Sequence, residues 1–72
     1  METKLPVVME VDVHKDSGLR VRRGAGLEYV GYGFLADEAK VLVLEIQNGW
    51  AYVAWPKYPD YPFGWVCMDY LK

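Results

Sequence analysis

The stretch KVLVLEIQNGWAYVAW, residues 40–55, decides the fold. Its first half is a short apolar run rich in β-branched residues, which favours a strand over a helix. The dipeptide Asn48-Gly49 is typical of a tight hairpin turn, and the residues after it can form a partner strand. The stretch therefore predicts a β-hairpin over 41–55.

Alternation along the second strand of this hairpin separates core from surface. Ala51 and Val53 are expected to face the core, which places Trp50 and Tyr52 on the outward face. An outward pair of large aromatic side chains either packs on the flank of the domain or forms a binding platform. Both interpretations remain open from the sequence.

Shorter strand patterns lie on both sides of the hairpin, in segments 5–14, 19–23 and 64–68. The residues expected to face the core are Val7, Met9, Val11, Val13, Leu19, Val21 and Val66. Segment 24–34 contains four glycines, for which positive φ is accessible, so we expect a bending loop there. No segment has a helical period, and the sequence predicts one all-β domain over 1–72, a small five- to six-stranded barrel.

The composition restricts both stability and function. The chain has one cysteine, Cys67, and one histidine, His14, so we expect no intramolecular disulfide, metal site or cofactor. The net charge of −2 argues against a general nucleic-acid binder. Nothing in the sequence orients Ser17, Cys67 or His14 as a nucleophile with its base, so we expect no catalysis and a packing role for Cys67.

The N-terminal segment has no pattern of a signal peptide or a transmembrane helix. Its short apolar run is interrupted by Glu10 and Asp12. The chain is therefore expected to be synthesised in the cytoplasm without membrane insertion.

Several motifs occur in a particular order between residues 18 and 72. They are GLRVRRGA at 18–25, VLVL at 41–44, NGW at 48–50, GWV at 64–66 and Tyr-Leu at 70–71. In this order they resemble the bacterial Src-homology-3 domains (SH3b), with segment 5–14 as the preceding strand. Three positions depart from the usual pattern: Arg20 replaces an asparagine, Ala25 a proline and Asp37 a glycine.

The resemblance implies an SH3-like barrel and a non-catalytic binding module. Such modules attach endolysins, autolysins and related hydrolases to the bacterial cell wall, often through the peptide part of peptidoglycan. This chain would then act at the cell wall, and tethering to a catalytic domain in a longer parent protein stays open. The alternative is an intracellular or phage-encoded protein–protein interaction module that uses the same groove, and a third class is an oligomer-forming subunit.

The resemblance also indicates which residues line the ligand groove. Trp50 and Tyr70 occupy positions that line a peptide groove, and the glycine-bearing loop with Glu28, Tyr29 and Tyr32 would form its other wall. Tyr52 joins these candidates as an outward aromatic residue. The basic residues Arg20, Arg22 and Arg23 form either a solvated strand face or a site of attraction for carboxylates or phosphates.

A second candidate region is AWPKYPDYPFGW, residues 54–65, with prolines at 56, 59 and 62. Its aromatic candidates are Trp55, Tyr58 and Tyr61. Proline fixes φ and stiffens this segment. The segment is therefore a rigid loop that folds its aromatic residues onto the barrel, an added ligand wall, or a polyproline ligand for another domain.

Overall fold

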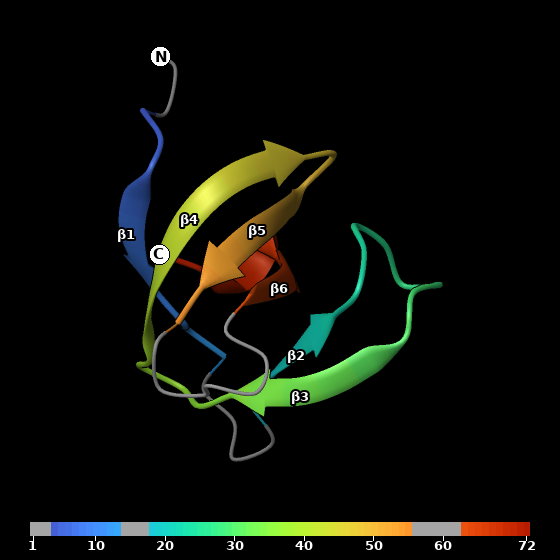
Figure 1. Cartoon of the computed structure of the whole chain (residues 1–72). Coiled ribbons are helices and arrows are strands. Elements are labelled where there is room, and N and C mark those ends of the chain that lie inside the picture. Colours follow the sequence, from blue (N-terminus) through green and yellow to red (C-terminus); the bar gives the residue numbers. More distant parts are fainter. Residues whose placement is uncertain (1–3, 14–17, 56–62) are drawn as a thin grey trace.

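The computed structural model describes residues 4–13, 18–55 and 63–72, and the statements below concern these residues. They form six strands and one turn of 3-10 helix (Figure 1). The elements are β1 (Val7–Glu10), β2 (Leu19–Arg22), β3 (Gly31–Leu35), β4 (Lys40–Gln47), β5 (Trp50–Ala54), β6 (Phe63–Cys67) and η1 (Met68–Tyr70). The chain is thus all-β, and its six strands form a small SH3-like barrel, as the sequence predicted.

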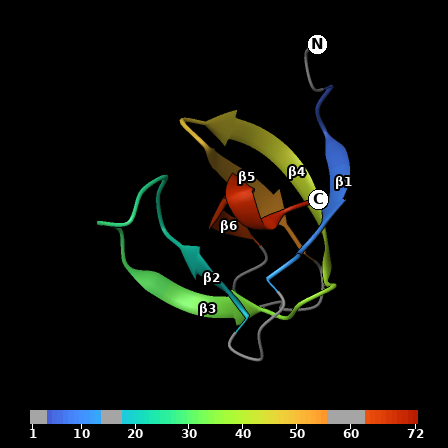
Figure 2. The same cartoon turned by 180° about the vertical axis from the view of Figure 1, so that it is seen from behind.

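The strands form one antiparallel sheet in the order β1-β4-β5-β6-β2-β3. The C-terminal residues pair with the end of β1, so that the C-terminus lies beside this strand (Figures 1 and 2). Here the N–H of Glu10 donates to the carbonyl of Lys72 at 2.8 Å, and the N–H of Lys72 donates back at 2.9 Å. This pairing fixes η1, which directly precedes it, against the N-terminal strand.

The predicted hairpin is present as β4 and β5. Asn48 and Gly49 adopt φ values of 49° and 83°, which is the left-handed geometry of a two-residue hairpin turn. The turn sets the register in which Gln47 pairs with Trp50 and Ile46 with Ala51. A β-bulge between Val43 and Glu45 then shifts the register, so that Val43 pairs with Val53. Because side chains alternate along a strand, this register sends Val43 and Val53 to the same, inner face.

The core consists of one inward-facing set of mostly branched aliphatic side chains. Its buried members are Val11, Leu19, Val21, Leu35, Val41, Val43, Ala51, Val53, Trp55 and Val66. Val7, Met9 and Val13 are half-buried and pack against this set. The predicted alternation in the N-terminal segment, in β2 and in β5 is therefore confirmed.

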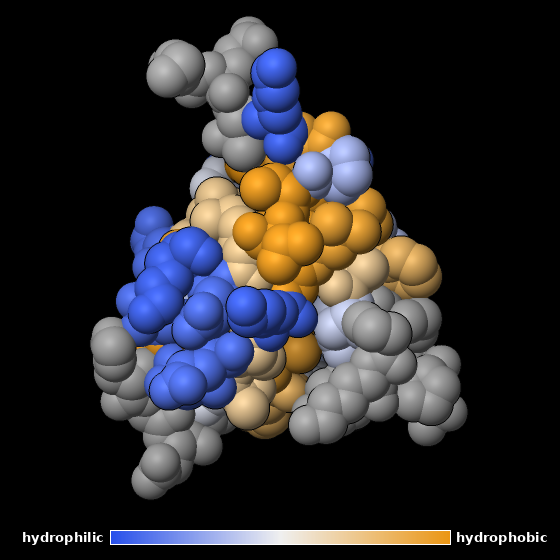
Figure 3. All heavy atoms as spheres, turned by 90° about the vertical axis from the view of Figure 1, so that its left-hand side faces the viewer, coloured by the Kyte–Doolittle hydropathy of each residue, from blue (hydrophilic) through white to orange (hydrophobic). Residues whose placement is uncertain are grey.

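The outward face of β4 is also apolar. Leu42 and Leu44 are each a little over one third exposed, and Val8 of β1, which pairs with Leu42, is 61% exposed. Figure 3 shows an apolar patch on the side of the molecule where β1 and β4 lie. The continuous apolar run in the sequence thus supplies one buried face and one partly exposed face.

Segment 24–34 differs from the sequence prediction in two ways. Its second half is not a bending loop, because β3 begins at Gly31 and pairs with β2, with one irregularity at Tyr32. The glycines that adopt positive φ among the described residues are Gly18 and Gly49. Gly24 is buried, and a side chain at this position would overlap the ring of Tyr29. Glycine in this loop provides space rather than an unusual backbone conformation.

No described residue belongs to a helix that is long and apolar enough to cross a membrane.

Candidate ligand-binding groove

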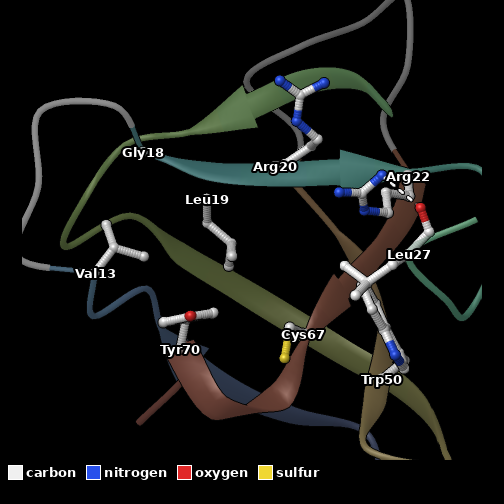
Figure 4. A pocket seen from close by; sticks show the side chains of 9 residues that line it. All are labelled: Val13, Gly18, Leu19, Arg20, Arg22, Leu27, Trp50, Cys67 and Tyr70. Atoms are coloured by element: carbon white, nitrogen blue, oxygen red, sulfur yellow. Dashed lines mark hydrogen bonds between the residues drawn. The ribbon is translucent and has the colours of Figure 1, made fainter. Parts of the chain in front are cut away.

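A groove opens where β2 and β6 separate. The two strands pair at Arg22 and Trp65, and beyond this point the start of β2 lies across a gap from the end of β6 and from η1 (Figure 4). The groove has a volume of about 200 Å³. It is lined by Val13, Gly18, Leu19, Arg20, Arg22, Leu27, Trp50, Cys67 and Tyr70.

One wall carries Trp50 and Tyr70. Trp50 is the first residue of β5 and pairs with Cys67 of β6, and both side chains are half-buried. The N–H of Met68 donates to the carbonyl of Gly49 at 2.9 Å, which holds η1 against the β4–β5 turn. Tyr70, at the end of η1, therefore lines the same groove as Trp50, and its side chain is 44% exposed.

The opposite wall is the loop of residues 23–30, which Arg22 holds in place. The Nη1 group of Arg22 donates to the carbonyl of Tyr29 at 2.9 Å and to the carbonyl of Leu27 at 3.2 Å. Leu27 lines the groove although 76% of its surface is exposed (Figure 4). The loop thus brings an apolar side chain to the groove opposite Trp50.

Arg20 lies beside Arg22 on the outward face of β2. Its guanidinium carbon is 4.6 Å from the centroid of the Phe34 ring, on the neighbouring strand β3. A side chain at Gly31 would overlap the Arg20 side chain, so this glycine leaves room for the arginine. The cation–π contact with Phe34 holds the guanidinium over β3, while the base of the side chain borders the groove (Figure 4).

The groove unites two of the predicted site residues, Trp50 and Tyr70, and leaves others outside. Glu28 and Tyr29 lie on the 23–30 loop and are exposed, but the loop residue that lines the groove is Leu27. The ring of Tyr29 packs over Gly24 instead. The loop that the resemblance indicated borders the groove, while the side chain that reaches the groove depends on how Arg22 holds that loop.

Tyr52 and Tyr32 belong to a separate aromatic cluster with Phe63 and Trp65. The ring centroid of Tyr52 is 5.9 Å from that of Phe63, nearly parallel at 14°, and 5.2 Å from that of Trp65. The hydroxyl of Tyr32 donates to the carbonyl of Phe63. These contacts correspond to the packing interpretation of the outward aromatic residues.

The environment of Tyr32 favours its neutral form. Burial, and secondarily the neighbouring Tyr52, raise the pKa of Tyr32 above its ordinary value of 10.0. The guanidinium of Arg23 lies 5.4 Å from the Tyr32 ring and partly opposes this rise in pKa. The cluster thus keeps the Tyr32 hydroxyl protonated, as its donation to Phe63 requires.

The second candidate region is described only in part. Trp55 is 3% exposed and belongs to the core, so in this conformation its ring packs inside the barrel and offers no face to a ligand. Tyr58 and Tyr61 lie outside the described residues. For Trp55, the interpretation as an aromatic residue folded onto the barrel agrees with its burial.

Sequence reasoning missed Leu27, Val13 and Cys67 as lining residues. The hairpin turn sets the β4–β5 register near Trp50. The register that places Cys67 opposite Trp50 joins β5 to β6 across the 54–65 segment, whose sequence does not fix it. Leu27 had no signal, since it lies in an irregular loop. The basic residues of β2 did carry a signal, and two of them line the groove.

The groove has the groups for binding by contact and by charge. Its lining includes aromatic rings, aliphatic side chains, two guanidinium groups and the free thiol of Cys67. Among the described residues, no group of three or more histidine, cysteine, aspartate or glutamate side chains is arranged to hold a metal ion.

Comparisons of the chain with protein-family models, with curated proteins and with solved structures found no match.

Proposed function

We propose that this chain is a non-catalytic binding module of the bacterial Src-homology-3 type. Its ligand would be the peptide part of cell-wall peptidoglycan, bound in the groove between η1 and the 23–30 loop. The observation that carries the proposal is the position of Trp50 and Tyr70 on one wall of an open groove, with Leu27 on the other.

The size of the groove supports a chain-like ligand. Sites that enclose a whole small molecule usually have volumes of roughly 300–1,000 Å³. A groove of about 200 Å³ accommodates only part of a ligand, such as one or two residues of an extended peptide. The remainder of such a peptide would continue over the surface on either side.

The chemistry of the walls supports a peptide. Trp50 and Tyr70 offer large contact areas with few rotatable bonds, so that binding orders few additional degrees of freedom. Both side chains retain exposed surface that a ligand could cover. Because the site is shallow, we expect weak binding by one module, and a repetitive polymer such as the cell wall would compensate through multivalent attachment.

Co-sedimentation with Gram-positive peptidoglycan, stripped of secondary polymers, tests the proposal. We expect the wild-type protein to sediment, and Trp50→Ala and Tyr70→Ala to remain largely in solution. Tyr29→Ala is the matched control, because Tyr29 and Tyr70 are 46% and 44% exposed but Tyr29 does not line the groove. Circular dichroism of each variant checks that it is folded.

Two outcomes would contradict the proposal in different ways. If all folded variants sediment as the wild type does, peptidoglycan binds elsewhere on the molecule. If the wild-type protein fails to sediment with several wall types, the cell wall is not its ligand, and a protein partner becomes the next candidate.

A further inference from the structure

The groove has the opposite charge to the chain as a whole. The chain has a net charge of −2, whereas the charged side chains that line the groove are Arg20 and Arg22. No aspartate or glutamate occurs among the lining residues of the described chain. The local excess of positive charge therefore favours an anionic group on the ligand.

Arg22 is fixed in an orientation suited to bind such a group. Its Nη1 atom is anchored by the carbonyls of Leu27 and Tyr29. Its other donors, on Nε and Nη2, have no acceptor among the described residues, and the guanidinium projects over the groove beside Leu27 (Figure 4). A fixed guanidinium loses little conformational entropy when it binds a ligand. Its planar array of N–H donors matches the two oxygens of a carboxylate.

Arg20 adds a second positive charge at a suitable distance. It is two residues from Arg22 on the same face of β2, which corresponds to about 7 Å along a strand. Its contact with Phe34 draws the guanidinium toward β3, so that it lies on the side of β2 away from η1 (Figure 4). Arg20 is exposed, so its attraction for an anion is more strongly screened by solvent than that of Arg22, which is half-buried.

We infer that the groove recognises a carboxylate of the wall peptide through Arg22, with the adjoining part of the peptide against Trp50 and Tyr70. This inference rests on the proposed function and adds the chemical feature that the groove selects. Arg22 becomes a specificity-determining residue, and Arg20 strengthens the same preference. A phosphate-rich wall polymer would be attracted by the two arginines but would make few contacts with Trp50 and Tyr70.

The test compares two synthetic stem peptides that differ at one kind of group. One peptide has free carboxylates, and in the other each carboxylate is converted to a carboxamide. Each peptide is added as a competitor of peptidoglycan in the co-sedimentation assay. The affinity of each peptide for the protein is measured by isothermal titration calorimetry. We expect the carboxamide peptide to bind at least about tenfold more weakly, since a charge-assisted bidentate pair is lost.

Three arginine variants locate the effect. Arg22→Gln is expected to bind both peptides equally, and Arg20→Gln to weaken binding of the free acid by only a few-fold. Arg23→Gln is the matched control, because Arg23 lies over Tyr32 and does not line the groove. It should keep the full preference for the free acid. Arg22→Gln also loses its contacts to the 23–30 loop, so the comparison of the two peptides on the wild-type protein decides the matter if this variant is unfolded.

The outcomes separate the inference from the proposed function. If both peptides bind the wild-type protein equally well, or if neither competes while peptidoglycan still sediments, the carboxylate inference is wrong and wall binding stands. If neither peptide nor peptidoglycan binds, both fail. Tighter binding of a purified phosphodiester wall polymer than of the free-acid peptide would also overturn the inference.

Discussion

Trp50 and Tyr52 lie two residues apart on the same face of β5, yet their surroundings differ. Trp50 borders the open groove, across from Leu27. Tyr52 contacts Phe63 and Trp65 and thereby becomes part of a packed cluster. Both side chains are half-buried, so the degree of exposure does not distinguish them.

The difference arises from the neighbours that each residue meets across the sheet. The register places the small side chain of Cys67 opposite Trp50 and the large ring of Trp65 opposite Tyr52. A small neighbour leaves the Trp50 ring bordering open space, whereas a large one covers the Tyr52 ring. An outward aromatic residue is therefore a candidate for ligand binding only where its cross-strand partners leave it accessible.

The largest expected effect comes from breaking the packed cluster at Gly64. A side chain there would overlap the Tyr32 hydroxyl on one side and the buried Val21 on the other. We expect Gly64→Ala to lower the free energy of unfolding by about 3 kcal/mol, as overpacking of a core does. Gly49→Ala is the control, since nothing lies within 4 Å of its added methyl group and its φ of +83° should lower stability by only about 1 kcal/mol. Equal midpoints of urea unfolding for the two variants would contradict the described packing.

The second effect distinguishes the two aromatic residues: we expect Tyr52 to contribute mainly to stability and Trp50 mainly to binding. Tyr52→Ala removes two ring contacts and is expected to lower the free energy of unfolding by about 2 kcal/mol. Trp50→Ala should lower it by about 1 kcal/mol or less, because a ring that borders the groove supports less of the fold. Urea denaturation gives the stabilities, and co-sedimentation gives the binding. If Trp50→Ala is the less stable variant and Tyr52→Ala binds peptidoglycan more weakly, the assigned roles of the two residues are wrong.

A smaller effect is expected from titration of Tyr32. Its pKa in the folded state is raised above 10.0, so folding favours the protonated hydroxyl. The stability that this provides is complete below pH 10 and is lost as the pH rises above 10 through the folded pKa. Tyr32→Phe should be less stable at neutral pH, since the hydrogen bond to Phe63 is absent, but its stability should fall less steeply in alkali. Parallel slopes for the two proteins between pH 9 and about 11.5 would exclude this role for Tyr32.

The smallest effect concerns Arg23, whose charge lowers the pKa of the same hydroxyl. Arg23→Gln is expected to raise the pKa of Tyr32 slightly further and to lower the free energy of unfolding by about 0.5 kcal/mol, as for an exposed cation–π contact. Spectrophotometric titration of the tyrosines measures the first change. An unchanged or lower pKa would show that the guanidinium does not act on the ring.

Local pattern predicted much of the fold. The turn at Asn48-Gly49 and the alternation of Ala51 and Val53 identified the hairpin and its buried face, since both depend only on neighbouring residues. The same reasoning missed β3, whose glycines give a weak strand signal. Pairing with β2 outweighs that local preference because each paired residue contributes hydrogen bonds to the sheet.

The candidate site was only partly accessible from the sequence. Resemblance brought together Trp50 and Tyr70, and the structure places both at one groove. The same reasoning added Tyr32 and Tyr52, which the structure assigns to the aromatic cluster, and it omitted Leu27. Whether a residue lines the groove or belongs to the cluster depends on its neighbours on the adjacent strands. Those neighbours are distant from it in the sequence.

By itself the sequence determined the strand character, the hairpin turn and the separation of inner from outer side chains, because alternation is a local property of extended backbone. Only the tertiary structure decided which outward aromatic residues border open space and which cover one another. It also decided that Arg22 holds the 23–30 loop by two carbonyls and so places Leu27 at the groove. The physical reason is that the groove forms where β2 and β6 separate, and these two strands pair at Arg22 and Trp65, which are distant in the sequence.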